Sequence, residues 1–144
     1  MKIAIEKYED YSEREILPLY QAVGWTNYAN NPAMLENAYG NSLCTLAAKD
    51  GQTIIGIVRA VGDGHSILYI QDLIVLPKFQ RRGIGRKLIE AIMSLYGNVY
   101  QTVLITDAAE ENVSFYSNVG LVDGSRFNCV PFMKINAGGT DKDE

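Results

Sequence analysis

One stretch constrains the fold of this chain more than any other: SILYIQDLIVLPKFQRRGIGRKLIEAIM, at residues 66–93. Its first part, residues 67–76, is a long apolar run rich in β-branched residues and predicts a buried strand. Pro77 ends that strand because it has no N–H for a strand ladder. The last part repeats apolar residues at the spacing of one helix face: Ile84, Leu88, Ile92 and Leu95. The order is therefore strand, basic glycine-containing turn, helix.

The turn between this strand and this helix favours an anionic ligand. The first N–H groups of a helix have no partner within the helix and carry a partial positive charge. Gly83 and Gly85 let a phosphate approach the backbone closely. Positive charge is added by Arg81, Arg82, Arg86 and Lys87. A diphosphate-bearing ligand fits these residues better than a single carboxylate, although neither the P-loop motif nor the complete dinucleotide fingerprint is present.

The signals along the rest of the chain predict one mixed α/β domain over residues 1–136, with a flexible tail at 137–144. Strands are expected at residues 1–6, 42–48, 53–61, 67–76 and 99–106, with a final strand or hairpin at 121–122 and 127–135. Helices are expected from a Ser12/Glu15 capping box to Gly24, from Pro32 to Tyr39, from Ile84, and at 112–119, where Gly120 suits the left-handed position after the helix end. Three consecutive strands should form an antiparallel meander, and the strand–helix–strand unit should add a parallel pair.

Composition excludes several classes of function. A net charge of −4 argues against a general nucleic-acid binder, whose footprint is a strongly basic face. No apolar stretch approaches the length needed to cross a bilayer, and the first residues lack a signal-peptide apolar region. We therefore expect a cytoplasmic protein without nucleic-acid or membrane partners. One histidine and two separated cysteines predict no metal site.

A second motif, ENVSFYSNVGL at residues 111–121, places Asn112 and Tyr116 four positions apart on one helix face. Together with Q-x-x-G-x-G at 80–85, it resembles motifs A and B of the GCN5-related N-acetyltransferase (GNAT) superfamily. Leu121 stands where that family usually has Phe, a change that concerns packing. The resemblance covers residues 3–135 and is strongest between Tyr69 and Leu121. A buried tyrosine with a hydrogen-bonded hydroxyl is the other interpretation of Tyr116.

The resemblance implies a GNAT fold: a central, mostly antiparallel sheet with one splayed parallel strand pair, flanked by about four helices. It also implies acetyl-CoA as co-substrate and no metal. The residues that it assigns to coenzyme A are Leu73, Ile74, Val75, Gln80, Arg81, Arg82, Gly83, Ile84, Gly85, Arg86, Lys87, Asn112 and Tyr116. In the family, a backbone N–H near Leu73–Val75 polarises the thioester carbonyl, and the tyrosine of motif B supplies the acid for the departing thiolate.

The implied reaction is direct attack of a primary amine on the thioester. Its general base is left open between a water chain and Asp72, which would alternatively orient a loop through backbone hydrogen bonds. Tyr69 stands where histone-acetylating relatives carry a glutamate, which argues against a histone-type mechanism. Arg59 and Asp63 either help to position an acceptor or, as is more common, are solvated charges, so neither is assigned a catalytic role.

The identity of the acceptor amine is also left between several alternatives. Trp25 and Tyr28, in a predicted loop, either pack on the core or form one wall of an acceptor pocket, which would also include Asp72. A polyamine, an aminoglycoside and a peptide amine are all compatible with the acidic balance of the chain. The alternative function is a non-catalytic acyl-CoA sensor or interaction module on the same fold. A homodimer is compatible with the resemblance, since dimers are common among such proteins.

Overall fold

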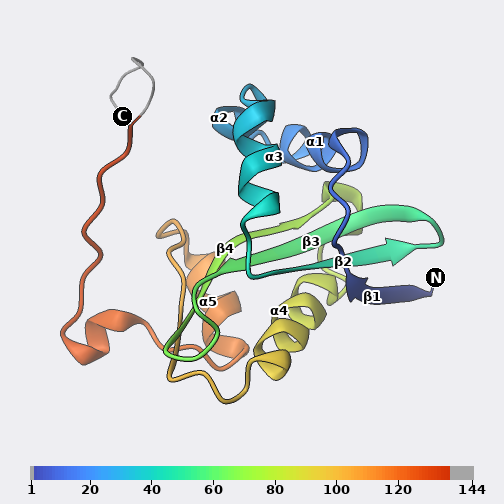
Figure 1. Cartoon of the computed structure of the whole chain (residues 1–144). Coiled ribbons are helices and arrows are strands. Elements are labelled where there is room, and N and C mark those ends of the chain that lie inside the picture. Colours follow the sequence, from blue (N-terminus) through green and yellow to red (C-terminus); the bar gives the residue numbers. More distant parts are fainter. Residues whose placement is uncertain (1, 137–144) are drawn as a thin grey trace. The chain divides into compact units, whose positions relative to one another are not determined.

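The computed structural model describes residues 2–136, and within them five strands form one sheet in the order β1-β2-β3-β4-β5 (Figure 1). The strands are β1 (Ile3–Lys7), β2 (Cys44–Asp50), β3 (Thr53–Val61), β4 (Ile67–Val75) and β5 (Gln101–Val103). The helices are α1 (Glu13–Ala22), α2 (Thr26–Ala29), α3 (Pro32–Gly40), α4 (Ile84–Leu95) and α5 (Glu110–Asn118), with short 3-10 helices η1 (Pro77–Phe79) and η2 (Gly124–Phe127). Strands β1 to β4 pair antiparallel and β4 pairs with β5 in parallel, so the predicted mixed α/β fold is confirmed.

The chain divides into two compact units, Met1–Leu104 and Ile105–Glu144, which are described separately. The sheet and helices α1 to α4 belong to the first unit, and α5 and η2 belong to the second. The tail predicted at residues 137–144 lies outside the described residues. No helix in residues 2–136 combines the length and apolar character that a membrane span requires.

Helices cover both faces of the sheet in the first unit: α1, α2 and α3 lie on one face and α4 lies on the other (Figure 1). On the first face, apolar side chains of α1 and α3 form a core with side chains of the strands: Ile16, Leu19, Tyr20, Leu35, Tyr39, Ala47, Ile54, Ile57 and Ile74. On the other face, α4 buries Ile84, Leu88 and Ile92 of the predicted apolar repeat together with Ile89, whereas Leu95 at the end of the helix is 54% exposed.

Helix α1 begins where the capping box predicted it, but with different hydrogen bonds. The Ser12 side chain makes no capping hydrogen bond. Instead, the Ser12 N–H donates to the Tyr8 hydroxyl at 2.9 Å, and that hydroxyl donates to Glu15 Oε1 at 2.9 Å. Pro18 lies inside the helix without ending it. Burial of the neighbouring Leu19, whose side chain is 1% exposed, offsets the hydrogen bond that proline cannot make.

Three other predictions for secondary structure need correction. Trp25 to Tyr28 is not a loop, because the Trp25 carbonyl accepts hydrogen bonds from the Tyr28 and Ala29 N–H groups and starts α2. Strand β5 covers only three residues of the predicted 99–106. The strand or hairpin predicted at 121–122 and 127–135 is absent from the described residues, where the Asp123 side chain accepts from the Ser125 N–H and begins η2 instead.

The C-terminal apolar pattern misled the prediction because apolar residues in a strand normally face a core. Here the segment has no strand partner among residues 2–136, and its large apolar side chains are exposed: Phe127, Val130, Phe132, Met133 and Ile135. By contrast, Gly120 after α5 adopts the predicted left-handed conformation, with φ +99°.

Gly56 on β3 lets α4 pack closely on the sheet. A Cβ at this position would lie 2.9 Å from the Ile74 carbonyl oxygen and 3.3 Å from Leu88 Cδ1. Since Leu88 is fully buried, neither neighbour can move without disturbing the packing between α4 and β4.

We therefore expect Gly56→Ala to lower the free energy of unfolding by about 1–3 kcal/mol, the usual cost of overpacking. The matched control is Gly40→Ala at the end of α3, where a Cβ meets nothing within 4 Å. Urea denaturation of both variants checks this expectation. Equal stability of the two variants would contradict it.

Candidate functional site

The turn between β4 and α4 leaves the first N–H groups of α4 accessible. Gly83 occupies the N-cap with φ +81° and supplies no side-chain hydrogen bond to the helix. A Cβ at Gly83 would meet nothing within 4 Å, so the space in front of the helix start is open. Arg81 adopts φ +66°, a left-handed conformation that is uncommon outside glycine. An uncapped helix N-terminus with open space before it is suited to an anion.

The side chains of the turn have distinct surroundings. Exposed basic side chains are contributed by Arg81, Arg82, Arg86 and Lys87. Arg86 Nε lies 2.9 Å from Glu90 Oε2, and the Arg82 guanidinium lies 5.5 Å from the centre of the Phe79 ring. Gln80 Nε2 donates to the Val75 carbonyl at 2.9 Å and so ties the turn to the end of β4.

These features fit a diphosphate. The backbone N–H groups and the basic side chains supply donors and positive charge, whereas the Ile84 side chain is buried and contributes only its backbone.

Strand β4 has an open edge next to this turn. It pairs with β5 only from Ile67 to Tyr69, so within residues 2–136 its edge from 70 to 75 has no strand partner. Backbone groups on such an edge can pair with an extended ligand. The side chains of Ile74 and Val75 are buried and that of Leu73 is half-buried, so a ligand there would meet mainly backbone.

A β-bulge in β4 precedes the open edge. The register places Arg59 opposite Asp72 but Ala60 opposite Ile70, so Gln71 is an extra residue in β4. Bulges redirect side chains and frequently lie beside functional sites. The sequence analysis predicted one continuous strand here, although the adjacent polar residues Gln71 and Asp72 interrupt its apolar run.

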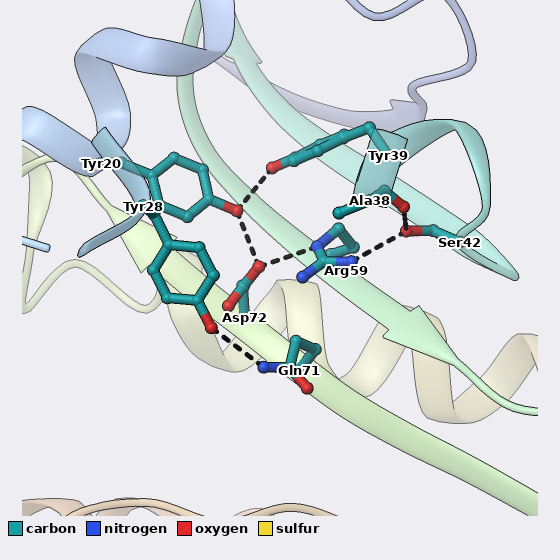
Figure 2. A network of polar contacts seen from close by, with 8 residues as sticks. All are labelled: Tyr20, Tyr28, Ala38, Tyr39, Ser42, Arg59, Gln71 and Asp72. Atoms are coloured by element: carbon teal, nitrogen blue, oxygen red, sulfur yellow. Dashed lines mark hydrogen bonds and ion pairs between the residues drawn. The ribbon is translucent and has the colours of Figure 1, made fainter. Parts of the chain in front are cut away.

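Asp72 lies at the centre of a buried polar network (Figure 2). Its side chain is 2% exposed, and its Oδ2 accepts hydrogen bonds from the Tyr20 hydroxyl at 2.7 Å and from Arg59 Nε at 2.8 Å. Arg59 is 4% exposed and also donates to Ser42 Oγ at 3.1 Å. The expectation that Arg59 is a solvated charge was therefore wrong, and the observed partners of Asp72 are side chains and not loop backbone.

The direction of each hydrogen bond in this network follows from the chemistry of its groups. Tyr20 has one hydroxyl proton and donates it to Asp72, so the hydrogen bond of 2.9 Å to Tyr39 has Tyr39 as donor. Burial raises the pKa of both phenols well above the usual range, and they stay protonated. Burial lowers the pKa of the Arg59 guanidinium, but the Asp72 charge, the hydrogen bond to Asp72 and the neighbouring Tyr20 and Tyr39 together outweigh this effect and raise the pKa above its ordinary value.

Trp25, at the N-cap of α2, and Tyr28, within α2, pack against this network. The Tyr20 ring centre lies 6.0 Å from that of Trp25 and 5.4 Å from that of Tyr28. The Tyr28 hydroxyl accepts a hydrogen bond from Gln71 Nε2 at 3.1 Å, and Trp25 remains 37% exposed. Packing on the core is thus observed for both residues, and their contact with an acceptor stays a prediction.

Asn112 and Tyr116 lie on α5 in the second unit. Asp107, which the sequence analysis missed, accepts from the Asn112 amide at 2.7 Å and from the Ala109 N–H at 2.9 Å. These two donors, the backbone N–H first, lower the pKa of Asp107. An aspartate that accepts from the N–H two residues on forms an Asx turn, a local signal that could have identified it. Burial and, secondarily, the Asp107 charge raise the pKa of the Tyr116 phenol, which therefore keeps its proton at neutral pH.

The other residue expected as a solvated charge, Asp63, organises the turn before β4. Its carboxylate accepts hydrogen bonds from the N–H groups of His65, Ser66 and Ile67 and from the Ser66 hydroxyl. Among residues 2–136, no three or more histidine, cysteine or carboxylate side chains are grouped to hold a metal ion.

Removing one partner of the Arg59–Asp72 pair should be costly. Arg59→Met leaves a buried carboxylate without its counter-ion and should lower the free energy of unfolding by about 3–5 kcal/mol. The double variant Arg59→Met/Asp72→Leu removes both charges and should recover much of that loss.

Urea denaturation measures both variants. The control is Lys49→Met at the surface pair with Glu6, where the nitrogen–oxygen distance is 3.3 Å and about 1 kcal/mol or less is expected. Additive losses in the double variant would contradict the expected coupling.

The sequence model of the acetyltransferase (GNAT) domain matches residues 7–127. A solved GNAT-family acetyltransferase from Streptococcus pneumoniae is 42% identical, with a TM-score of 0.86 over 94% of this chain and 98% of that one. An aminoglycoside N-acetyltransferase solved in complex with CoA is 16% identical, with a TM-score of 0.73 over 94% of this chain and 95% of that one, and shows the shared fold.

An uncharacterized N-acetyltransferase of Porphyra purpurea is 21% identical over 75% of this chain, and the match spans 63% of that relative's length. The domain match and the Streptococcus pneumoniae relative agree with the two motifs at 80–85 and 111–121. This chain belongs to the GNAT acetyltransferase family.

Proposed function

We propose that this chain is an acetyl-CoA-dependent N-acetyltransferase that moves the acetyl group to a primary amine by direct attack on the thioester. The observation that carries this proposal is the start of α4. There an uncapped helix N-terminus, open space at Gly83 and four basic side chains follow directly after a strand with an open edge. This combination suits a ligand with a diphosphate and an extended amide-containing arm.

Each part of acetyl-CoA has a proposed place in this region of the chain. The diphosphate would lie at residues 80–87, with the backbone of Gly83, Ile84 and Gly85 and the basic side chains as donors. The arm would run along the open edge of β4 near Leu73, Ile74 and Val75, where a backbone N–H would polarise the thioester carbonyl. Bound acetyl-CoA supplies the activated acetyl group, and Asn112 and Tyr116 would complete its contacts.

The domain match supports treating both units as one acetyltransferase domain, because residues 7–127 extend across the boundary between Leu104 and Ile105. The aminoglycoside N-acetyltransferase with the same fold supports a small amine as acceptor. A polyamine, an aminoglycoside and a peptide amine all remain in the proposal. The cytoplasmic location, the homodimer and the lack of a metal requirement stay predictions.

The reaction requires two proton transfers. An alkylammonium such as that of Lys has a pKa of about 10 and must lose a proton before it can attack. The thiol of coenzyme A is similar to that of Cys, which has a pKa of about 8.5, and the departing thiolate can take a proton from a phenol. Tyr116 is the proposed donor, since its raised pKa keeps it protonated.

Two candidates for the general base remain, Asp72 and a chain of water molecules. Asp72 is buried, and its Oδ2 already accepts from Tyr20 and Arg59, which favours the water route.

The test of the proposed function is acetyl-CoA turnover across a panel of polyamines, aminoglycosides and peptide amines, read as free thiol and as product mass. We expect thiol release that depends on the amine and product that is heavier by one acetyl group. Tight CoA binding without thiol release for any amine would instead favour the non-catalytic sensor.

Two variants of Gly83 serve as a matched pair in this test. Asp and Asn tolerate the left-handed conformation and cap helices equally well, but only Asp adds a negative charge at the proposed diphosphate site. We expect Gly83→Asp to raise KM for acetyl-CoA at least about tenfold over Gly83→Asn, since charges about 4 Å apart repel strongly. Equal KM values would place the diphosphate elsewhere.

Tyr116→Phe removes the proposed acid and should lower kcat about 100-fold, with KM for acetyl-CoA nearly unchanged. Because the phenol must be protonated and burial raises its pKa, the fall in the wild-type rate at high pH should begin above the ordinary range of a tyrosine. The control is Tyr100→Phe, at a tyrosine that is 86% exposed. Unchanged turnover of Tyr116→Phe, with chemistry rate-limiting, would remove Tyr116 from the mechanism.

A further inference from the structure

One residue, Tyr20 of α1, joins the buried ion pair in the sheet (Figure 2) to two aromatic side chains, Trp25 at the N-cap of α2 and Tyr28 within α2. Its side chain is fully buried, and its hydroxyl donates to Asp72 Oδ2 at 2.7 Å while accepting from Tyr39 at 2.9 Å. The same ring contacts both Trp25 and Tyr28. Hydrogen bonds at the hydroxyl therefore fix the ring against which these two residues pack.

Asp72 is poorly placed to contact an acceptor itself. It is 2% exposed, and its charge is matched by Arg59 at 2.8 Å. Trp25 and Tyr28 lie farther out: Trp25 is 37% exposed, Tyr28 is half-buried, and the Tyr28 hydroxyl also bonds to the exposed Gln71 of β4. An effect of Asp72 on an acceptor would thus pass through Tyr20 to these outer rings.

We propose that Tyr20 is a positioning residue for the acceptor amine. Its hydroxyl, held between Tyr39 and Asp72, fixes the wall formed by Trp25 and Tyr28, against which the group that carries the amine packs. Asp72 and Arg59 hold this wall through Tyr20, and Asp72 does not take the proton of the amine. This inference rests on the proposed function and on the predicted contact of Trp25 and Tyr28 with the acceptor.

The substitution that tests it is Tyr20→Phe, which keeps the ring and its volume. It removes two hydrogen bonds and leaves the Tyr39 hydroxyl without its acceptor and Asp72 with one donor fewer. The matched control is Tyr8→Phe, because the Tyr8 hydroxyl likewise donates to a carboxylate, that of Glu15, and accepts from the Ser12 N–H at the start of the same helix. Both variants remove hydrogen bonds of α1, but only Tyr20→Phe removes hydrogen bonds of the Asp72 network.

We expect Tyr20→Phe to raise KM for the amine about tenfold, the size expected for a lost hydrogen bond to a charged group, while KM for acetyl-CoA stays within about twofold. Tyr8→Phe should change neither KM. Trp25 is the only tryptophan of the chain, so its fluorescence reports on the wall without any need for turnover. Acrylamide should quench Trp25 more strongly in Tyr20→Phe than in Tyr8→Phe and wild type.

The outcomes separate this inference from the proposed function. Equal amine KM and equal Trp25 quenching in the two variants would overturn the role of Tyr20, whatever the acceptor is. If wild type acetylates no amine, the proposed function fails. The difference in Trp25 quenching between Tyr20→Phe and Tyr8→Phe then decides by itself whether Tyr20 fixes the positions of Trp25 and Tyr28. Loss of the ascending limb of the pH–rate profile in Asp72→Asn would make Asp72 the base and overturn its action through Tyr20.

Discussion

Arg59 and Asp72 face each other across β3 and β4, with 2.8 Å between the guanidinium Nε and the carboxylate Oδ2, and both are almost fully buried. Removing two charges from water is costly, so such a pair adds little net stability. The pair does favour one geometry, since a buried charge without its partner would cost much more free energy. Tyr20 of α1 donates to the carboxylate, and Ser42, beyond α3, accepts from the guanidinium. One pair thus sets how two strands and the helices above them fit together.

The sheet separates this network from the turn that carries the cofactor assignment. On one face, α1 to α3 enclose the ion pair and its tyrosines; on the other, α4 packs closely on β3 because Gly56 has no side chain. The start of α4 follows the open edge of β4 in sequence, after a single 3-10 turn and the basic segment. Strand β4 is common to both arrangements, since its bulge at Gln71 immediately precedes Asp72 and the open edge continues through Val75.

Local patterns predicted the elements whose signals lie within a few residues. The helical repeat from Ile84, the Pro32 helix start and the Gly120 cap were all confirmed, because helix periodicity and terminal residues act locally. The two failed strand predictions have a common cause. The apolar segment 127–135 was predicted as a strand from its composition, yet a strand exists only where another strand accepts its hydrogen bonds, and the described residues contain none for it.

The sequence by itself determined the family, through Q-x-x-G-x-G at 80–85 and the Asn112/Tyr116 spacing. Each motif lies within one turn or one helix, whose structure depends on residues close to it in the chain. Only the tertiary structure decided the state of the charged residues. Arg59 and Asp72 are 13 positions apart along the chain, and nothing in that spacing indicates that they bond. Strand register brings them together, Tyr20 reaches them from 52 positions away, and burial then makes the contact obligatory.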